Sequence, residues 1–289
     1  MGIKQYGSVL GHKILLGIYK IFGYRFVAFI LNFVVFYYVV LTPNVKADLK
    51  SFYQHLGIKL TYMRYFSHIK LFALSIFDRF VSRIKPDELS FERQNRELFV
   101  SLQDGGIVLL SHVGGWATAG YSMQAEIPPM NIVMQESAKE KIRRLENSKK
   151  LKNTESVKVI DLNDGAIAAN IQIANALMKN EVVAMMADRV VDERRAVEVD
   201  FFTSKVQINK NPFEIAHRFK KPLVAAFVVW EKQRHYKIIF EDIDTKNRSL
   251  QEIAQEYMDI LAKIIKIYPN QWYNFYDFFK QRIIDVNKQ

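Results

Sequence analysis

The sequence contains no cysteine in 289 residues, which excludes disulfide bonds, thiol catalysis and cysteine-based zinc sites. Several enzyme motifs are also missing: the dinucleotide-binding GxGxxG, the Walker phosphate loop, the GxSxG nucleophile elbow and the HExxH zinc helix. The histidines do not cluster, since His217 and His235 lie apart in basic surroundings. The sequence therefore predicts no histidine metal site.

Acidic residues are scarce relative to basic ones, with 30 Asp and Glu against 41 Lys and Arg, so the formal net charge is +11. This surplus favours anionic partners, such as membrane surfaces, phosphorylated lipids, acidic proteins or nucleic acids. Charge is the only feature that points to nucleic acid, so we expect no nucleic-acid partner. The length suits one large domain or one domain with an appendage, and 49% hydrophobic residues allow a sizeable core.

Charge is entirely absent from residues 26–42, an apolar run with Lys or Arg on both sides. Its length of roughly 17 residues is the lower limit for a bilayer span. A buried core helix has the same pattern, but we favour a membrane-associating helix because Tyr37 and Tyr38 suit an interface. We therefore divide the chain into an N-terminal membrane-associating helical segment, residues 1–46, and an α/β domain, residues 47–289.

Short apolar stretches alternate with helical patterns through the second part of the chain. Strands are predicted at residues 107–110, 131–134, 157–160, 182–186, 222–230 and 236–240. Helices are predicted at residues 47–84, 91–102, 121–124, 137–152, 166–178 and 250–268. The stripe at 47–84 fits either a membrane surface or the core. This alternation predicts an α/β fold with a mostly parallel central sheet flanked by helices.

The most informative stretch is residues 107–120, IVLLSHVGGWATAG. Four apolar residues, typical of a buried parallel strand, end at a Ser-His pair and two glycines. His112 therefore falls in the crevice beyond the strand, where α/β proteins place their chemistry, and it can carry a proton near neutral pH. Gly114 and Gly115 would let backbone N–H groups approach a bound group. A plain tight turn with a hydrogen-bonded histidine fits the same spacing, so both interpretations are open.

Asp188 and Arg189 follow the predicted strand at 182–186, so we expect them at the same sheet edge as His112. Arg189 is suited to clamp a phosphate or carboxylate, although a structural ion pair between the two residues fits as well. The polar segment that follows carries basic residues that either bind anionic head groups or belong to a solvated loop: Arg194, Arg195, Lys205 and Lys210. The aromatic-rich residues 269–279 either fold back into the core, wall an acyl tunnel or rest on lipid.

Together these stretches resemble the lysophospholipid acyltransferase superfamily, in particular its lipid A late (lauroyl/myristoyl) acyltransferase branch. The resemblance covers nearly the whole chain: the N-terminal apolar segment, then ILLSHVGGW, MMADRVVDERRAVEVDFF, NPFEIAHRFKKPLVAAFVV and PNQWYNFYDFF. In that family, a pattern like HxGNWE contains a His taken as general base and an acid taken as its partner. His112, Gly114 and Trp116 match this pattern, whereas Gly115 stands in place of the Asn and Ala117 in place of the Glu.

Ala117 leaves three explanations open. Another acid substitutes, with Asp188, Glu126 and Glu136 as candidates, or His112 works unaided, or the activity has been lost. A His without an orienting carboxylate loses control of its tautomer and stabilisation of its imidazolium.

The resemblance implies a membrane-associated acyltransferase that moves a fatty acyl chain from a thioester donor to a hydroxyl of a lipid acceptor, such as a lipid A precursor. The donor would be an acyl carrier protein or acyl-CoA, and the expected location is the cytoplasmic face of a bacterial inner membrane. His112 would be the general base, and the N–H groups of Gly114 and Gly115 would stabilise the oxyanion. The predicted substrate-binding residues are Gly114, Gly115, Trp116, Asp188 and Arg189. No metal or bound cofactor is required, because the acyl thioester is a co-substrate. The alternative is a non-catalytic membrane- or lipid-binding relative that has lost the acidic partner of its His.

Overall fold

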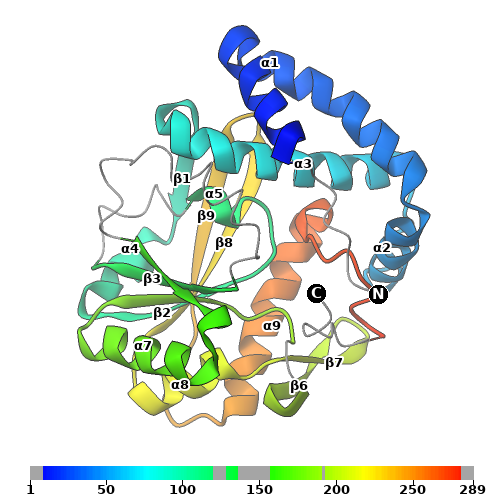
Figure 1. Cartoon of the computed structure of the whole chain (residues 1–289). Helices are drawn as coiled ribbons and strands as arrows, with labels where there is room; N and C mark the ends of the chain where they lie inside the picture. The colour runs from blue at the N-terminus through cyan, green and yellow to red at the C-terminus, as the bar shows by residue number, and fades with distance from the viewer. Residues whose placement is uncertain (1–8, 120–127, 136–156, 191–192, 281–289) are drawn as a thin grey trace.

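A seven-stranded sheet forms the centre of the protein, in the order β1-β9-β8-β2-β5-β3-β4 (Figure 1). The computed structural model describes residues 9–119, 128–135, 157–190 and 193–280. The strands are β1 (Ser90–Gln94), β2 (Gly106–Leu110), β3 (Met130–Met134), β4 (Val157–Asp161), β5 (Val182–Met186), β8 (Leu223–Lys232) and β9 (His235–Asp242). Neighbouring strands are parallel except for β8 and β9. The predicted fold class is therefore confirmed.

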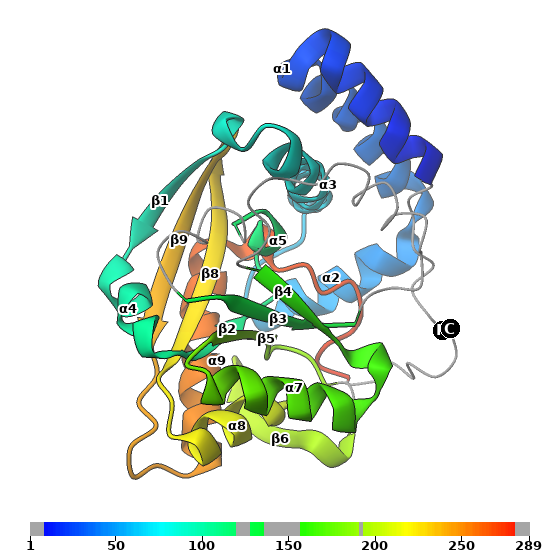
Figure 2. The ribbon, with the colours of Figure 1, turned by 60° about the vertical axis from the view of Figure 1, so that its left-hand side comes forward.

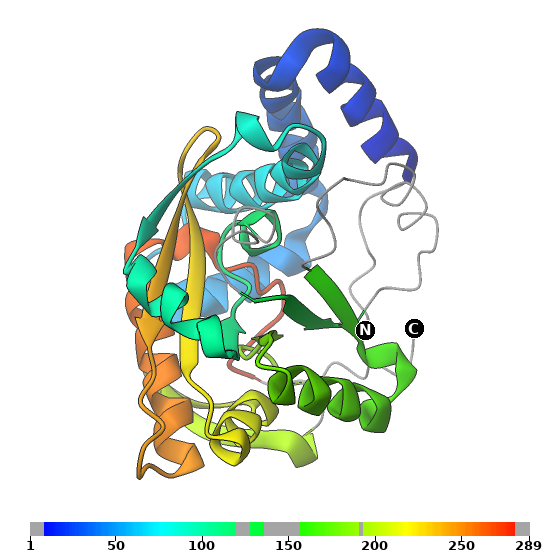
Figure 3. The same ribbon diagram turned by 90° about the vertical axis from the view of Figure 1, so that its left-hand side faces the viewer.

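Strand β2 lies in the middle of the sheet and is buried on both faces. Ile107 and Leu109 join the core on one face, whereas Val108 and Leu110 join the core on the other. The first face is covered by α7 (Ala166–Met178), α8 (Asn211–Phe219) and α9 (Leu250–Ile267), and the second by α4 (Arg96–Val100) and α5 (Trp116–Ala119). Figures 2 and 3 show α7 and α8 side by side below the sheet. Burial on both faces explains why this strand is a continuous apolar run.

Three helices form the N-terminal region: α1 (Val9–Leu41), α2 (Pro43–His55) and α3 (Tyr62–Ile84). Helix α1 is kinked at Gly23, which has φ of 77°, and it lies over α3 on the side away from the sheet (Figures 1 and 2). One side of α1 is buried: Tyr19, Tyr24, Val27 and Leu31 belong to a core shared with α3, and Val35 is buried as well. The other side exposes large apolar residues, including Phe22, Phe26, Phe29, Phe33, Phe36, Tyr37 and Val40.

A buried carboxyl group fastens α1 to the rest of the molecule. Asp78 of α3 accepts hydrogen bonds from the hydroxyl groups of Tyr24 on α1, at 2.7 Å, and Tyr236 on β9, at 2.6 Å. Residues Ile14–Leu41 are long and apolar enough to cross a membrane by length and composition. Because one side is packed on α3, α1 is a candidate membrane-associating helix with only its outer side available to lipid. The predicted domain boundary at residue 46 stays a prediction.

Local patterns failed where tertiary pairing decided the structure. The helix predicted at 91–102 is wrong at its start: Phe91 lies in β1 and stacks on Tyr236 of β9, with ring centroids 5.8 Å apart. Cross-strand packing overrides local propensity at such a position. The predicted helix at 47–84 is interrupted between α2 and α3, where Gly57 has φ of 72°. The predicted helices at 121–124 and 137–152 lie outside the described residues.

The polar segment before Lys210 is not a solvated loop. It forms an antiparallel hairpin of β6 (Ala196–Phe201) and β7 (Ser204–Asn209). The β6 residues alternate between buried and more exposed positions, which is the period of a half-buried strand. The short helix α8 follows the hairpin directly and was not predicted.

Candidate active site

The register of two central strands brings two predicted site residues together. In the parallel pair β2 and β5, Leu110 lies opposite Met186. His112 and Asp188 each follow the last residue of their strand by two positions, so they meet at the carboxyl edge of the sheet. The His112 Nδ1 atom is 2.8 Å from the Asp188 Oδ1 atom.

Asp188 is fully buried and both of its oxygens accept hydrogen bonds. Its Oδ2 atom accepts from the backbone N–H of His112 at 2.9 Å and from the indole Nε1–H of Trp272 at 3.0 Å. Burial alone would raise the pKa of Asp188, but the adjacent His112 and Arg189 lower that pKa to about 2. An ionised carboxylate only accepts hydrogen bonds, so the Nδ1 atom of His112 must carry the hydrogen.

His112 is thereby held in the tautomer whose Nε2 atom can accept a proton. Burial lowers the pKa of His112 below its ordinary value, with the charge of Asp188 opposing that shift. The imidazole is therefore neutral at neutral pH, as a general base must be. Its side chain is 21% exposed, so a reacting group can reach it. The indole of Trp116 meets the imidazole edge to face, with ring centroids 6.0 Å apart.

The C-terminal segment folds back and fixes the loop after β2. The backbone N–H of Tyr273 donates to the carbonyl of His112 at 2.8 Å. The side-chain amide of Gln271 bonds both backbone groups of Trp230 on β8, each at 2.7 Å. Trp272 lies between them, buried in the core. Sequence reasoning identified this segment as aromatic-rich but did not find Trp272 as a donor to Asp188.

The glycine amides expected to stabilise the oxyanion already have backbone partners, so their oxyanion role stays a prediction that these contacts do not support. The N–H of Gly114 donates to the carbonyl of Gln271 and that of Gly115 to the carbonyl of Val228, both at 2.7 Å. These glycines allow close packing instead. Gly114 has φ of 57°, and a Cβ atom there would lie 2.0 Å from the Val228 oxygen, while a Cβ at Gly115 would lie 2.4 Å from the ring of Tyr236.

Substrate binding by Asp188 and Arg189 stays a prediction. Asp188 is fully buried, and the bonds it accepts come from His112 and Trp272. Arg189 donates from Nε to the side-chain oxygen of Asn274 at 2.6 Å and from a terminal nitrogen to the carbonyl of Tyr273 at 2.7 Å. Its guanidinium also lies 5.6 Å from the ring centroid of Tyr276. Arg189 therefore ties the C-terminal segment to the end of β5.

Among the acids considered as partners of His112, Asp188 is the one found beside it. Glu126 and Glu136 lie outside the described residues. Ala117 occupies the first turn of α5 and is half-buried. Substrate binding by Trp116 stays a prediction.

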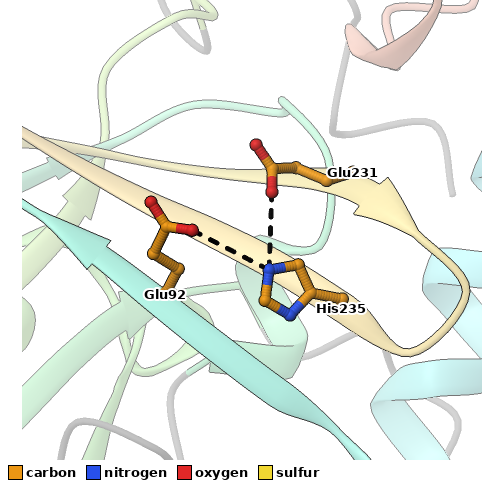
Figure 4. A group of neighbouring side chains, drawn as sticks. All are labelled: Glu92, Glu231 and His235. Carbon is orange, nitrogen blue, oxygen red and sulfur yellow. Dashed lines mark ion pairs between the residues drawn. The ribbon is translucent and has the colours of Figure 1, made fainter.

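A separate group of side chains has metal-ligating chemistry. Glu92 of β1, Glu231 of β8 and His235 of β9 point toward one another, and their ligand atoms lie within 4.8 Å of each other (Figure 4). The Nε2 atom of His235 is 3.4 Å from a Glu231 oxygen, and the Lys237 ammonium is 3.5 Å from a Glu92 oxygen. Because Lys237 already supplies a counter-charge, we treat this group as an exposed ion-pair cluster and assign no metal to it.

Residues 81–281 match the family model of the bacterial lipid A biosynthesis acyltransferases. The chain belongs to this family. It is also 24% identical over 169 residues to a phosphatidylinositol mannoside acyltransferase of Mycolicibacterium smegmatis. That alignment covers 58% of this chain and 55% of the relative, so it spans about half of the relative's length. The family match begins near the end of α3 and contains both His112 and Asp188.

Proposed function

We propose that this protein transfers a fatty acyl chain from a thioester donor, an acyl carrier protein or acyl-CoA, to a hydroxyl group of a lipid acceptor. Membership of an acyltransferase family supports the reaction class. The observation that carries the proposal is the contact between His112 and Asp188, with 2.8 Å between Nδ1 and Oδ1 at the sheet edge.

The chemistry follows from the free nitrogen of the imidazole. The Nε2 atom of His112 takes the proton of the acceptor hydroxyl as its oxygen attacks the thioester carbonyl. The tetrahedral intermediate collapses, the carbon–sulfur bond breaks, and the thiolate recovers that proton from Nε2. An ester and a free thiol result. Asp188 stabilises the imidazolium formed between these two proton transfers.

The acceptor would reach the site from a membrane surface. The exposed apolar side of α1 would enter the interfacial layer, with the helix in the plane of the bilayer because its other side is packed on α3. Lys20 and Arg25 are exposed on α1 and would face anionic head groups. By analogy with the names of the family and the relative, the acceptor would be a lipid A precursor or a phosphorylated glycolipid, at the cytoplasmic face of a bacterial inner membrane.

The test is transfer of label from a radioactive acyl thioester to lipid. Purified protein is incubated with labelled acyl carrier protein or labelled acyl-CoA and a lipid extract, and the products are separated and identified by mass spectrometry. We expect a new acylated lipid with wild type, none with His112→Ala, and wild-type yield with the control His217→Ala, which changes an exposed histidine on α8. Equal turnover by His112→Ala would remove His112 from the mechanism.

Ala117 favours a second function, that of a non-catalytic lipid-binding relative. The contact between Asp188 and His112 weighs against it, because the histidine does not lack an acid. Binding to lipid vesicles without any acylated product from either donor would support this second function.

A further inference from the structure

A basic pocket lies outside the pair of His112 and Asp188. It is open to solvent, has a volume of about 600 Å³ and is lined by α7, by the short helical turn η4 (Glu193–Arg195) and by α8. Four basic residues and one acidic residue line it: Arg194, Arg195, Lys210, Arg218 and Glu214. Its apolar lining is provided by Ile173, Ile215 and Phe219. The lining thus carries a formal excess of three positive charges beside an apolar surface.

The β6–β7 hairpin explains why these cations gather. Ala196 pairs with Asn209 at the base of the hairpin, and the backbone N–H of Lys210 donates to the carbonyl of Arg195 at 3.0 Å. The backbone therefore holds positions 195 and 210 side by side. Glu214 pairs with Lys210 at 3.2 Å. Arg195 and Arg218 add further positive charge to the lining, which an anion in the pocket would offset.

The pocket is also close along the chain to the proposed catalytic pair. Arg194 follows Asp188 by six residues, so the two are separated by at most about 22 Å even in a fully extended chain. A substrate that spans this distance would place a second part of its structure at the pocket while it reacts at His112.

We propose that this pocket binds a phosphate ester carried by one of the two substrates, with the adjoining apolar part of that substrate against Ile215 and Phe219. The inference rests on the acyl transfer proposed above. Arginine presents a planar fork of donors that matches phosphate oxygens, which is why Arg195 and Arg218 are the residues to change. Phosphate esters occur in both substrate classes, in the phosphopantetheine part of the thioester donor and in the head group of a phospholipid acceptor.

Direct binding separates these two sources. Equilibrium dialysis measures the Kd of labelled coenzyme A, representing the donor, and of soluble dihexanoyl phosphatidic acid, representing the acceptor. The double variant Arg195→Gln/Arg218→Gln is compared with the control Lys266→Gln, which removes an exposed cation on α9 away from the pocket. We expect the double variant to bind one probe at least about tenfold more weakly, as the loss of charged hydrogen bonds implies, and the control to bind both like wild type.

Each outcome decides the inference. Weaker binding of coenzyme A alone assigns the pocket to the donor, and weaker binding of phosphatidic acid alone assigns it to the acceptor. Wild-type Kd values for both probes in the folded double variant, or no binding of either probe by wild type, would overturn the inference. Such a result would leave the acyl transfer proposal standing as long as the labelled product still depends on His112, so the two failures can be distinguished.

Discussion

Replacing Asp188 by Asn tests the proposed pair directly, because the substitution keeps the size of the side chain and removes its charge. Asp188 accepts three hydrogen bonds, two from His112 and one from Trp272. An Asn offers one acceptor oxygen and an amide group that donates. If that amide faces His112, the stable tautomer has Nδ1 as acceptor and the hydrogen on Nε2. The nitrogen required as base is then blocked.

The expected loss is large because the site is buried and water cannot replace the carboxylate. Asp188→Asn removes the bond from the Nδ1–H of His112 to the carboxylate, and a hydrogen bond to a charged group contributes about 1.5–3 kcal/mol. It also removes the negative charge that stabilises the imidazolium. The equivalent substitution in the triad of serine proteases lowers kcat by about 10⁴, or about 5.5 kcal/mol. We therefore expect Asp188→Asn to lower kcat by about 10³ to 10⁴, with little change in KM for the donor.

The assay measures initial rates of labelled acyl transfer at saturating donor. The control is Asp242→Asn, which makes the same chemical change at an exposed position at the end of β9 and should keep the wild-type rate. Thermal unfolding followed by circular dichroism verifies that both variants are folded. A folded Asp188→Asn protein within about threefold of wild-type kcat would refute the assignment of Asp188 as the partner of His112.

Three further changes have defined outcomes. Trp272→Phe removes one donor to the buried carboxylate of the pair, so the pKa of the imidazole rises and the acidic limb of the kcat/KM profile moves to higher pH; Trp230→Phe, whose indole N–H has no partner among the described residues, should not move it. Gly115→Ala places a Cβ 2.4 Å from the ring of Tyr236 and should lower the free energy of unfolding by about 1–3 kcal/mol, and an unchanged urea midpoint would contradict this. Burial raises the pKa of Asp78 from 3.8 to about 6. The contribution of this carboxyl group to the free energy of unfolding is therefore complete below pH 3.8 and is lost as the pH rises through 6. Between pH 4 and 7, the free energy of unfolding measured in urea should therefore fall by about 3 kcal/mol less in Asp78→Asn than in wild type. The same dependence on pH in both proteins would exclude the effect.

The central elements could be predicted well from the sequence because they are buried and therefore consist mainly of apolar residues. The residues of β5 and α7 were predicted with the bounds that the structure has, and β2 differs by one residue. Strand β5 is a run of five apolar residues, and such a short apolar run is typical of a buried strand. In contrast, β1 is an edge strand of mixed polarity, and its conformation depends on pairing with β9, which lies more than 140 residues later. No local pattern carries that information.

The candidate site divides in the same way. His112 and Asp188 were expected at one sheet edge because each follows an apolar strand. The docking of the C-terminal segment was not predictable, and it decides which polar groups are available at the site. The backbone N–H of Gly114 donates to the carbonyl of Gln271, and the indole N–H of Trp272 donates to the carboxylate of Asp188. An amide near a reactive histidine is therefore an oxyanion donor only if no distant carbonyl already accepts from it.

The change at Ala117 gains a physical meaning from this geometry. An acid at that position would approach His112 from the first turn of α5, whereas Asp188 approaches from β5, in a register fixed by the hydrogen bonds of the sheet. The orientation of His112 then depends on two adjacent core strands and not on the turn that follows β2. That turn does not have to supply the acid, and it serves packing instead. Gly115 lies there against the ring of Tyr236, whose hydroxyl group donates to Asp78 beneath α1. The loop that carries His112 is thus connected through packed side chains to the helix proposed to rest on the membrane.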